Sequence, residues 1–324
     1  MAERPYATGG SDRHRLRRLH ALARAAAEET CAESACQVRG GVRRAKLHIL
    51  GLCRWSYPSQ TGAFNNRGQS LEEIRAELYA PERLDTRLFF FERLVLPSLR
   101  AQTDPDFTLL LMMGDRLPEP WRGRLLELIA DMPQIKPVFL AEGQNHMEVC
   151  RDVMLAERDQ GADLVVEFRL DDDDAVAASF VERLRGLYRQ LRPIYKDAGR
   201  CAVDFCRGFL FRCESDGSIG FEPVEARLWT PALALYLSPD HKRSLLNYPH
   251  MRTWRQMPVL SLNTRPMFIR GGHDGNDSEI GRRKVDHFRF RMEKLPDLAQ
   301  ADFGIDLEAF ERDWKALMAR SGGS

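Results

Sequence analysis

Residues 163–174 read Asp163-Leu-Val-Val-Glu-Phe-Arg-Leu-Asp-Asp-Asp-Asp174, an apolar segment that ends in four consecutive aspartates. Adjacent carboxylates repel one another, and they destabilise a fold unless a cation neutralises them. Asp is also a preferred N-cap residue, so a solvated helix cap is the alternative interpretation. Ser179-Phe-Val-Glu182 forms a capping box of its own, however, and places the next helix start beyond the aspartates. The pattern therefore predicts a strand followed by a loop that carries Asp171 to Asp174.

The sequence before this stretch alternates between strand-like and helix-like segments. Three short apolar runs are typical of strands: Leu47–Leu52, Phe107–Met113 and Val138–Leu140, of which Phe107–Met113 suits a strand buried on both faces. Three segments have helical spacing and start signals, and they begin at Asp85, Pro120 and Asn145. This order predicts an α/β fold with a mostly parallel sheet and helices on both faces. In such open sheets, ligands bind at the carboxyl ends of the strands, which is where the aspartates fall.

The sequence after Asp174 follows a different order. A helix is expected from Ser179, a hairpin over 208–221 around Asp216-Gly217, and a closing helix over Leu307–Ala319. The rest, up to Arg283, is rich in Pro, Arg, His and Trp, and we expect irregular loops there.

Composition excludes several classes of protein. The 324 residues include 48 Lys and Arg against 47 Asp and Glu, and this net charge of +1 lacks the basic footprint of a nucleic-acid binder. The apolar runs fall short of the roughly 18 residues that a membrane span needs, so we expect at most peripheral membrane contact. The seven cysteines form no C-x-x-C motif, which favours reduced thiols and a cytoplasmic protein.

Three motifs together resemble a known family. The strand end Arg-Leu-Asp171-Asp-Asp-Asp-Ala resembles the Asp-x-Asp signature of glycosyltransferases with the GT-A fold. The segment from Leu96 to Asp115, with its Gln-Thr-Asp turn, resembles their first helix and second strand. The late motif His273-Asp-Gly-Asn276-Asp-Ser278 is similar to one in a bacterial rhamnosyltransferase family. The resemblance covers roughly residues 47–278 and implies a GT-A (Rossmann-like) nucleotide-diphospho-sugar transferase fold.

The resemblance also implies roles for individual residues. Asp171 would meet the ribose or a metal and Asp173 would bind the metal, which is Mn²⁺ or Mg²⁺, and act in catalysis. His273 would be a third metal ligand from a glycine-rich loop. The further donor-binding candidates are Arg54, Asp115, Arg169, Asp172, Asp174, Asn276 and Ser278.

Arg54 and Arg169 each allow two interpretations. Arg54 follows the first strand, where it could reach the nucleotide or remain an ordinary surface residue. Arg169 lies two residues before Asp171 and therefore on the same strand face, with Glu167 two residues further back. A buried Glu167–Arg169 pair that orients the loop is the favoured interpretation, and a phosphate contact is the other.

The sequence thus predicts a metal-dependent glycosyltransferase. It would move a sugar, rhamnose by resemblance, from a nucleotide-diphosphate donor to a hydroxyl of a glycan or small-molecule acceptor, while the metal stabilises the leaving diphosphate. An inverting reaction also needs a carboxylate base. Glu222, Glu225 and Asp240 fall in the appropriate half of the chain, and Glu225 is our candidate.

Two alternatives come from other classes. A metal-dependent nucleotidyltransferase would use similar carboxylates, but it needs a glycine-rich phosphate loop where this chain has Gly51-Leu-Cys-Arg54-Trp-Ser-Tyr-Pro58. A non-catalytic sugar- or partner-binding protein would use the aspartates as a structural Ca²⁺ site.

The expected organisation has three parts. Residues 1–45 form a mobile basic extension, and residues 46–290 form the catalytic domain, with a donor-binding half (46–174) and an acceptor half (175–290). Residues 291–324 form a C-terminal helix and tail.

Overall fold

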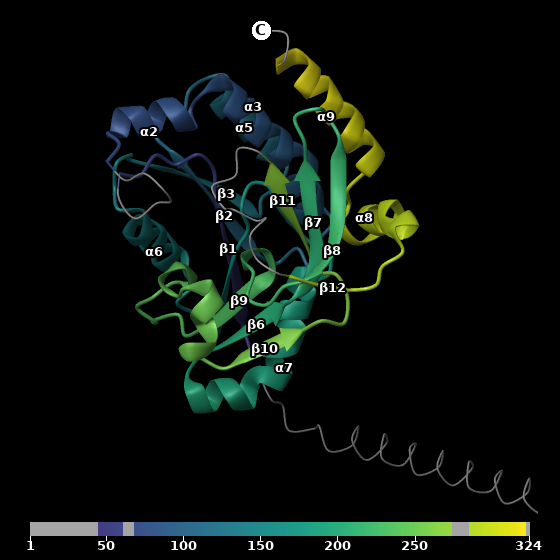
Figure 1. Ribbon diagram of the computed structural model, residues 1–324. Coiled ribbons are helices and arrows are strands. Elements are labelled where there is room, and N and C mark those ends of the chain that lie inside the picture. Colours follow the sequence, from purple (N-terminus) through teal and green to yellow (C-terminus); the bar gives the residue numbers. More distant parts are fainter. Residues whose placement is uncertain (1–44, 61–67, 274–284, 322–324) are drawn as a thin grey trace, which may run out of the picture. The chain divides into compact units, whose positions relative to one another are not determined.

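The computed structural model describes residues 45–60, 68–273 and 285–321, and Lys46–Ser324 form one compact unit (Figure 1). Its strands are β1 (Leu47–Arg54), β2 (Thr108–Gly114), β3 (Ile135–Leu140), β4 (Leu164–Arg169), β5 (Asp174–Val176), β6 (Cys201–Phe205), β7 (Arg207–Cys213), β8 (Ile219–Glu225), β9 (Leu233–Leu237), β10 (Val259–Leu262), β11 (Phe268–His273) and β12 (Asp286–His287). Its α-helices are α2 (Leu71–Leu78), α3 (Pro81–Phe90), α4 (Leu96–Arg100), α5 (Trp121–Ile129), α6 (His146–Glu157), α7 (Phe180–Ala198), α8 (Leu295–Phe303) and α9 (Leu307–Ser321). Short helical turns are η1 (Phe91–Val95), η2 (Thr230–Ala232), η3 (Leu245–Asn247), η4 (His250–Arg255) and η6 (Met292–Lys294).

Two sheets organise the unit. The first has the order β10-β6-β9-β4-β1-β2-β3, in which only β9 runs antiparallel to its neighbours among the described strands. The second has the order β12-β8-β7-β11-β5, with β11 parallel to β7 and the other pairs antiparallel. The predicted mostly parallel sheet is confirmed, because the apolar runs of β1, β2 and β4 are buried on both faces.

Helices cover both faces of the first sheet. On one face, Leu50 of β1 packs in a buried cluster with Val149 of α6. On the opposite face, Gly51 leaves room for the Phe168 ring, which packs edge-on against Phe180 of α7 with ring centroids 5.3 Å apart. A Cβ on Gly51 would lie 2.8 Å from Phe168 Cε1, so this close strand contact requires glycine.

The helix expected from Asp85 begins earlier, at Pro81, and continues without a break through α3, η1 and α4. Proline suits a first helical turn, where its missing N–H is not needed. Asp85 lies inside the helix and accepts a hydrogen bond from Trp121 Nε1 at 2.7 Å. The π turn Phe91–Val95 comes directly before Pro97, which cannot donate a backbone hydrogen bond.

The segment expected to be irregular up to Arg283 contains β9, β10 and β11, so that expectation was wrong. Each of these strands has only four to six residues. It is stabilised by pairing with strands that are distant in the sequence, and no local sequence pattern marks it. The predicted hairpin is confirmed as β7–β8, with Gly217 at φ 86° in the turn. The predicted helix starts at Asn145 and Ser179 are also confirmed, although the Ser179 side chain makes no cap bond.

The C-terminal helix packs on an aromatic cluster. Phe310 of α9 contacts the rings of Phe89 in α3 and Phe211 in β7, with centroids 4.9 and 5.0 Å apart. The five cysteines in the described segments are buried free thiols, as expected. Within those same segments, the search for a helix long and apolar enough to cross a membrane found none.

Candidate functional site at the carboxyl ends of the strands

The parallel pairing of β1 and β4 brings Arg54 and the aspartate loop together. Leu52 of β1 pairs with Arg169 of β4, so the two strands end at the same edge of the sheet. Arg54 and Asp171 each follow this pair by two residues. Arg54 Nη2 donates to Asp171 Oδ1 at 2.9 Å, and Arg169 Nη2 donates to Asp171 Oδ2 at 3.1 Å. Asp171 therefore binds a guanidinium on each oxygen. Burial alone would raise the pKa of Asp171, but Arg169 and Arg54 hold it below its usual range.

A neutral histidine completes this group. His146, the first residue of α6, accepts a hydrogen bond on Nε2 from Arg54 Nη1 at 2.8 Å, because a guanidinium can only donate. The proton of the neutral ring is then on Nδ1, which lies 3.2 Å from Ser59 Oγ. Burial and the neighbouring Arg54 lower the pKa of His146 to about 3. The ring therefore orients Arg54 without adding charge.

The other three aspartates are buried, whereas Asp171 is half-buried. Asp172 forms an ion pair with Arg87 of α3, and burial raises its pKa in spite of that partner. Burial raises the pKa of Asp173 to about 7. Asp174 Oδ1 accepts a hydrogen bond from the backbone N–H of Gly271 at 3.1 Å. A Cβ on Gly271 would overlap the Asp173 carbonyl oxygen, so glycine is required where β11 approaches the loop.

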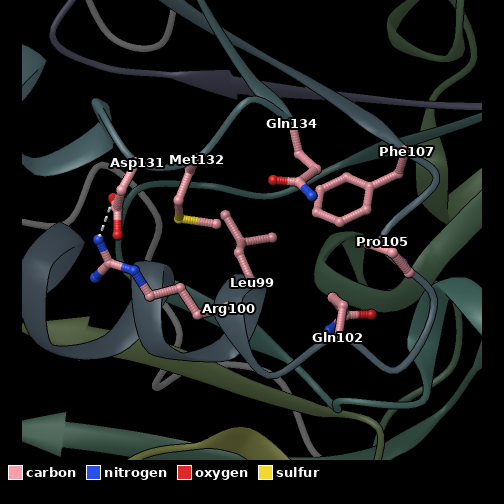
Figure 2. Close-up of a pocket in the computed structure, with 8 residues that line it drawn as sticks. All are labelled: Leu99, Arg100, Gln102, Pro105, Phe107, Asp131, Met132 and Gln134. Atoms are coloured by element: carbon pink, nitrogen blue, oxygen red, sulfur yellow. Dashed lines mark hydrogen bonds and ion pairs between the residues drawn. The ribbon is translucent and has the colours of Figure 1, made fainter.

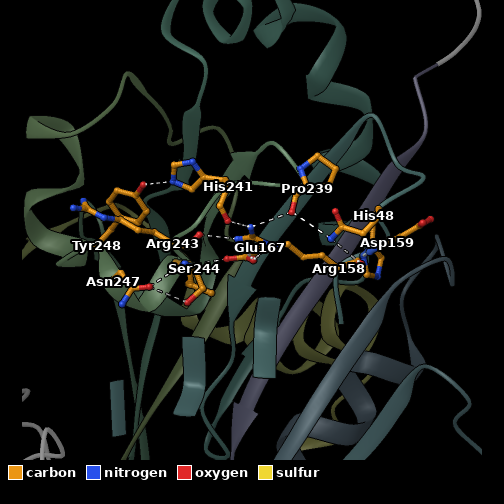
Figure 3. A network of polar contacts seen from close by, with 12 residues as sticks. His48, Arg158, Asp159, Glu167, Pro239, His241, Arg243, Ser244, Asn247 and Tyr248 are labelled. Atoms are coloured by element: carbon orange, nitrogen blue, oxygen red, sulfur yellow. Dashed lines mark hydrogen bonds and ion pairs between the residues drawn. The ribbon is translucent and has the colours of Figure 1, made fainter. Parts of the chain in front are cut away.

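Arg169 does not pair with Glu167, contrary to the favoured interpretation. Glu167 binds Arg158 instead, at 2.7 Å, and both side chains have no exposed surface (Figure 3). Arg158 also donates to the carbonyl oxygens of His241 and Arg243, and Glu167 Oε2 accepts from Leu245 N at 2.7 Å. The pair thus anchors the segment after β9, and Arg169 remains available to Asp171.

A cavity of about 210 Å³ opens beside Arg54 and Arg169. Its lining comes from α6, β9 and the turns η2 to η4: His146, Met147, Thr230, Leu233, Leu235, Leu245, Leu246, Tyr248, Pro249, His250 and Thr253. Sequence reasoning missed the residues after Thr230. The signal in the sequence is the richness of this stretch in Pro, Arg, His and Trp, which by itself predicts loops and no particular site residue.

A second cavity of similar volume lies at the opposite edge of the sheet (Figure 2). Phe107 and Gln134, which line it, come just before β2 and β3, at the amino ends of these strands. An Arg100–Asp131 ion pair of 2.8 Å lies at its side. Because open α/β sheets bind ligands at the carboxyl ends, the cavity beside Arg54 is the candidate site.

The remaining predicted residues lie elsewhere or outside the described residues. Asp115 is exposed after β2, where its N–H donates to Leu140 O. Glu225 is three strands away from Asp174, roughly 14 Å across the second sheet. Arg207 and Asn263 bind Glu225 at 2.8 and 2.9 Å, and their hydrogen bonds lower its pKa. The His273 side chain and the predicted donor contacts Asn276 and Ser278 lie outside the described residues.

Two carboxylates of the described loop, Asp171 and Asp172, do not fit a metal ion. Both oxygens of Asp171 are bonded to guanidinium groups, and Asp172 has an ion pair with Arg87. Across residues 45–60, 68–272 and 285–320, no group of three or more His, Cys, Asp or Glu side chains could hold a metal ion. The predicted metal site therefore stays a prediction, and no step below depends on it.

Comparison with known proteins identifies the family. The sequence pattern of a family described as "Putative rhamnosyl transferase" matches residues 48–284. This chain belongs to that family. The resemblance to GT-A glycosyltransferases drawn from the sequence is thereby confirmed, and so is the predicted fold class, with its mostly parallel sheet and helices on both faces. No curated protein matches the chain.

Solved structures give distant likenesses. S. aureus TarS 1-349 in complex with UDP-GlcNAc is 11% identical, with 72% of this chain and 60% of that chain covered at a TM-score of 0.35. A "putative nucleotide-diphospho-sugar transferase" from Desulfovibrio desulfuricans G20 is 12% identical, with 85% and 98% covered at a TM-score of 0.36. The chain thus spans about 60% of the length of TarS 1-349.

Proposed function

We propose that this glycosyltransferase moves a sugar from a nucleotide-diphosphate donor to an acceptor hydroxyl. The observation that carries the proposal is the cavity at the carboxyl ends of β1 and β4, where two guanidinium groups face one carboxylate. Such a group has a net positive charge beside an enclosed space, which suits a diphosphate. Charge develops on the diphosphate as the glycosidic bond breaks, and fixed cations stabilise that charge.

We propose that the transferred sugar is rhamnose, as the family description suggests. The cavity wall supports this choice, because leucines line much of it: Leu233, Leu235, Leu245 and Leu246. Rhamnose is a 6-deoxy sugar whose methyl group gains from contact with apolar surface, whereas the corresponding hydroxyl of glucose would lose its hydrogen bonds there.

The base that accepts the acceptor proton has two candidates. Glu225 stays the candidate from sequence, although its ion pair with Arg207 favours the charged form and weakens it as a base. His250 lines the cavity, and its Nδ1 lies 2.6 Å from Leu228 O, so Nδ1 donates and Nε2 is the accepting nitrogen of the neutral ring. We favour His250 for this role.

Kinetics of two variants separate these candidates. His250→Gln should lower kcat by about 100-fold or more with little change in donor KM, whereas Glu225→Gln should leave kcat within about threefold. A normal kcat in His250→Gln together with a large loss in Glu225→Gln would reverse the assignment.

A donor screen tests the function itself. Sugar nucleotides that differ in base and sugar are incubated with the full chain, and ligand binding is measured by the rise in melting temperature. Release of a nucleoside diphosphate together with a glycosylated acceptor supports the proposal. Release of pyrophosphate from a nucleoside triphosphate would instead identify a nucleotidyltransferase, and binding without turnover would identify a sugar-binding protein.

A further inference from the structure

The cations that bind the first two aspartates of the loop belong to the protein itself. Arg54 and Arg169 bind Asp171, and Arg87 binds Asp172. Arg270 of β11 lies opposite Asp174 in the strand register, with its guanidinium over the Trp229 ring. Its charge only partly offsets the burial that raises the pKa values of Asp173 and Asp174. Guanidinium groups from β1, α3 and β4 thus bind the loop. Asp171 and Asp172 therefore have cationic partners without a divalent cation.

We propose that Arg54 and Arg169 bind and neutralise the donor diphosphate in place of a divalent metal, while Asp171 holds both guanidinium groups in position. This inference rests on the proposed function and concerns the same site. In this arrangement Asp171 is an internal anion that the diphosphate joins or displaces. Removing its negative charge while keeping its shape should therefore help diphosphate binding, whereas the same change in a metal ligand would harm it.

The geometry of the two arginines supports this role. The side chains of Arg54 and Arg169 have 14% and 13% of their surface exposed, so they act in a partly desolvated site where charge interactions are strong. A guanidinium has five N–H donors in a planar fork that matches phosphate oxygens. Asp171 takes one N–H group from each, and both side chains line the cavity.

The cavity also holds unsatisfied polar atoms. Among the described residues, Arg169 Nε and the hydroxyl of fully buried Thr253 have no hydrogen-bond partner, although both residues line the cavity. Buried polar groups without partners are costly, so they indicate a place for ligand or water. A phosphate oxygen would accept from Arg169 Nε, and a donor hydroxyl or phosphate would pair with Thr253.

Neutral His146 limits the competition for Arg54. It takes one N–H of Arg54 at 2.8 Å without contributing a negative charge, so it fixes the guanidinium and leaves its charge for the ligand. Asp171 then faces two cations, one on each carboxylate oxygen. Arg54, Arg169 and Asp171 together have a net charge of +1, which a diphosphate would neutralise.

The first experiment measures metal dependence. Binding of UDP, GDP and dTDP to the full chain is followed by calorimetry in excess EDTA, in Mg²⁺ and in Mn²⁺. For the nucleotide that binds, we expect dissociation constants within about threefold of one another across the three conditions. Binding that needs Mg²⁺ or Mn²⁺ would overturn this inference and leave the proposed function standing. Failure of every nucleotide in every condition would overturn the proposed function and the inference together.

The second experiment uses variants with opposite expected signs. In EDTA, Arg169→Gln should weaken binding of the nucleotide by about 10- to 100-fold, since it removes charge-assisted hydrogen bonds. Asp171→Asn, which has nearly the same shape, should bind inorganic pyrophosphate as tightly as the unmodified chain or up to about tenfold more tightly. Pyrophosphate is used because it has no ribose that Asp171 could contact.

The control for net charge is Arg151→Gln. Arg151 lies on α6 like His146 and is ion-paired with its neighbour Asp152 at 2.7 Å, so its loss changes the net charge equally without touching the cavity. Binding in this variant should stay within about twofold of the unmodified chain. Equal losses in Arg151→Gln and Arg169→Gln, or a tenfold loss in Asp171→Asn, would overturn the inference. Because Asp171→Asn keeps both arginines, it remains informative even if Arg169→Gln fails to fold.

Discussion

Replacing Arg158 by methionine should destabilise the fold strongly. The change leaves the carboxylate of Glu167 without its cation at a position where neither side chain is exposed. It also removes the donor to the carbonyl oxygens of His241 and Arg243. Removing one partner of a buried pair costs about 3–5 kcal/mol. The expected loss in unfolding free energy is therefore about 4 kcal/mol, or roughly 8–16 °C in melting temperature.

The loss should depend on pH. Burial already raises the pKa of Glu167, and without Arg158 the folded protein should hold a proton on this carboxyl more tightly still. A carboxyl whose pKa is raised by folding loses stability as pH rises from its unfolded pKa towards its folded one. The deficit of Arg158→Met should therefore be smaller at about pH 5 than at about pH 8.

Urea unfolding followed by circular dichroism measures these differences in unfolding free energy. A change in the urea concentration at the midpoint, with an unchanged dependence of free energy on urea, reports a change in stability. Asp131→Asn is the control, because its ion pair with Arg100 is exposed and should contribute less than about 1 kcal/mol. The double variant Arg158→Met/Glu167→Leu should recover part of the loss, since it leaves no charge buried. A deficit no larger than that of Asp131→Asn would refute the reasoning.

Two further predictions concern a buried carboxyl and a glycine. Burial raises the pKa of Asp204 to about 6, so the folded protein holds a proton on this carboxyl more tightly than the unfolded chain does. Stability of about 3 kcal/mol from this proton should therefore be lost as pH rises from about 4 to 6. In urea unfolding, Asp204→Asn should remove this dependence on pH. Parallel stability curves for the two proteins would contradict it. Gly271→Ala should weaken nucleotide binding by about tenfold or more, because its Cβ displaces the Asp173 carbonyl, whereas Gly220→Ala, with open space around it, should change binding little. Equal binding in both variants would exclude the proposed close contact.

The location of the aspartates at the carboxyl edge of the first sheet could be predicted from sequence, because the patterns that indicate it are local. Apolar runs such as Phe107–Met113 exclude exposed positions, so they must lie in strands buried on both faces. A carboxylate run after the strand Leu164–Arg169 then has to fall at the carboxyl edge of the sheet. The α/β class and the location of the aspartates followed from these two facts.

The partners of the aspartates could not be predicted in the same way. Arg87 is 85 residues from Asp172 in the chain, and Arg54 is 117 residues from Asp171. Sequence spacing favoured Glu167 as the partner of Arg169, because residues two apart share a strand face. In the structure Arg158, which directly follows α6, binds Glu167 in place of Arg169. This pairing depends on how the chain returns from α6 to the sheet.

By itself, the sequence determined the fold class, the strand Phe107–Met113 buried on both faces, the hairpin at Asp216-Gly217 and the edge of the sheet at which the aspartates lie. Those features depend on hydrophobic periodicity and turn chemistry, which act over a few residues. Only the tertiary structure decided which cations meet the aspartates and which side chains line the cavity. Strand register and the packing of α3, α6 and β11 set those contacts, because ion pairs form between whichever groups the fold brings within a few ångströms.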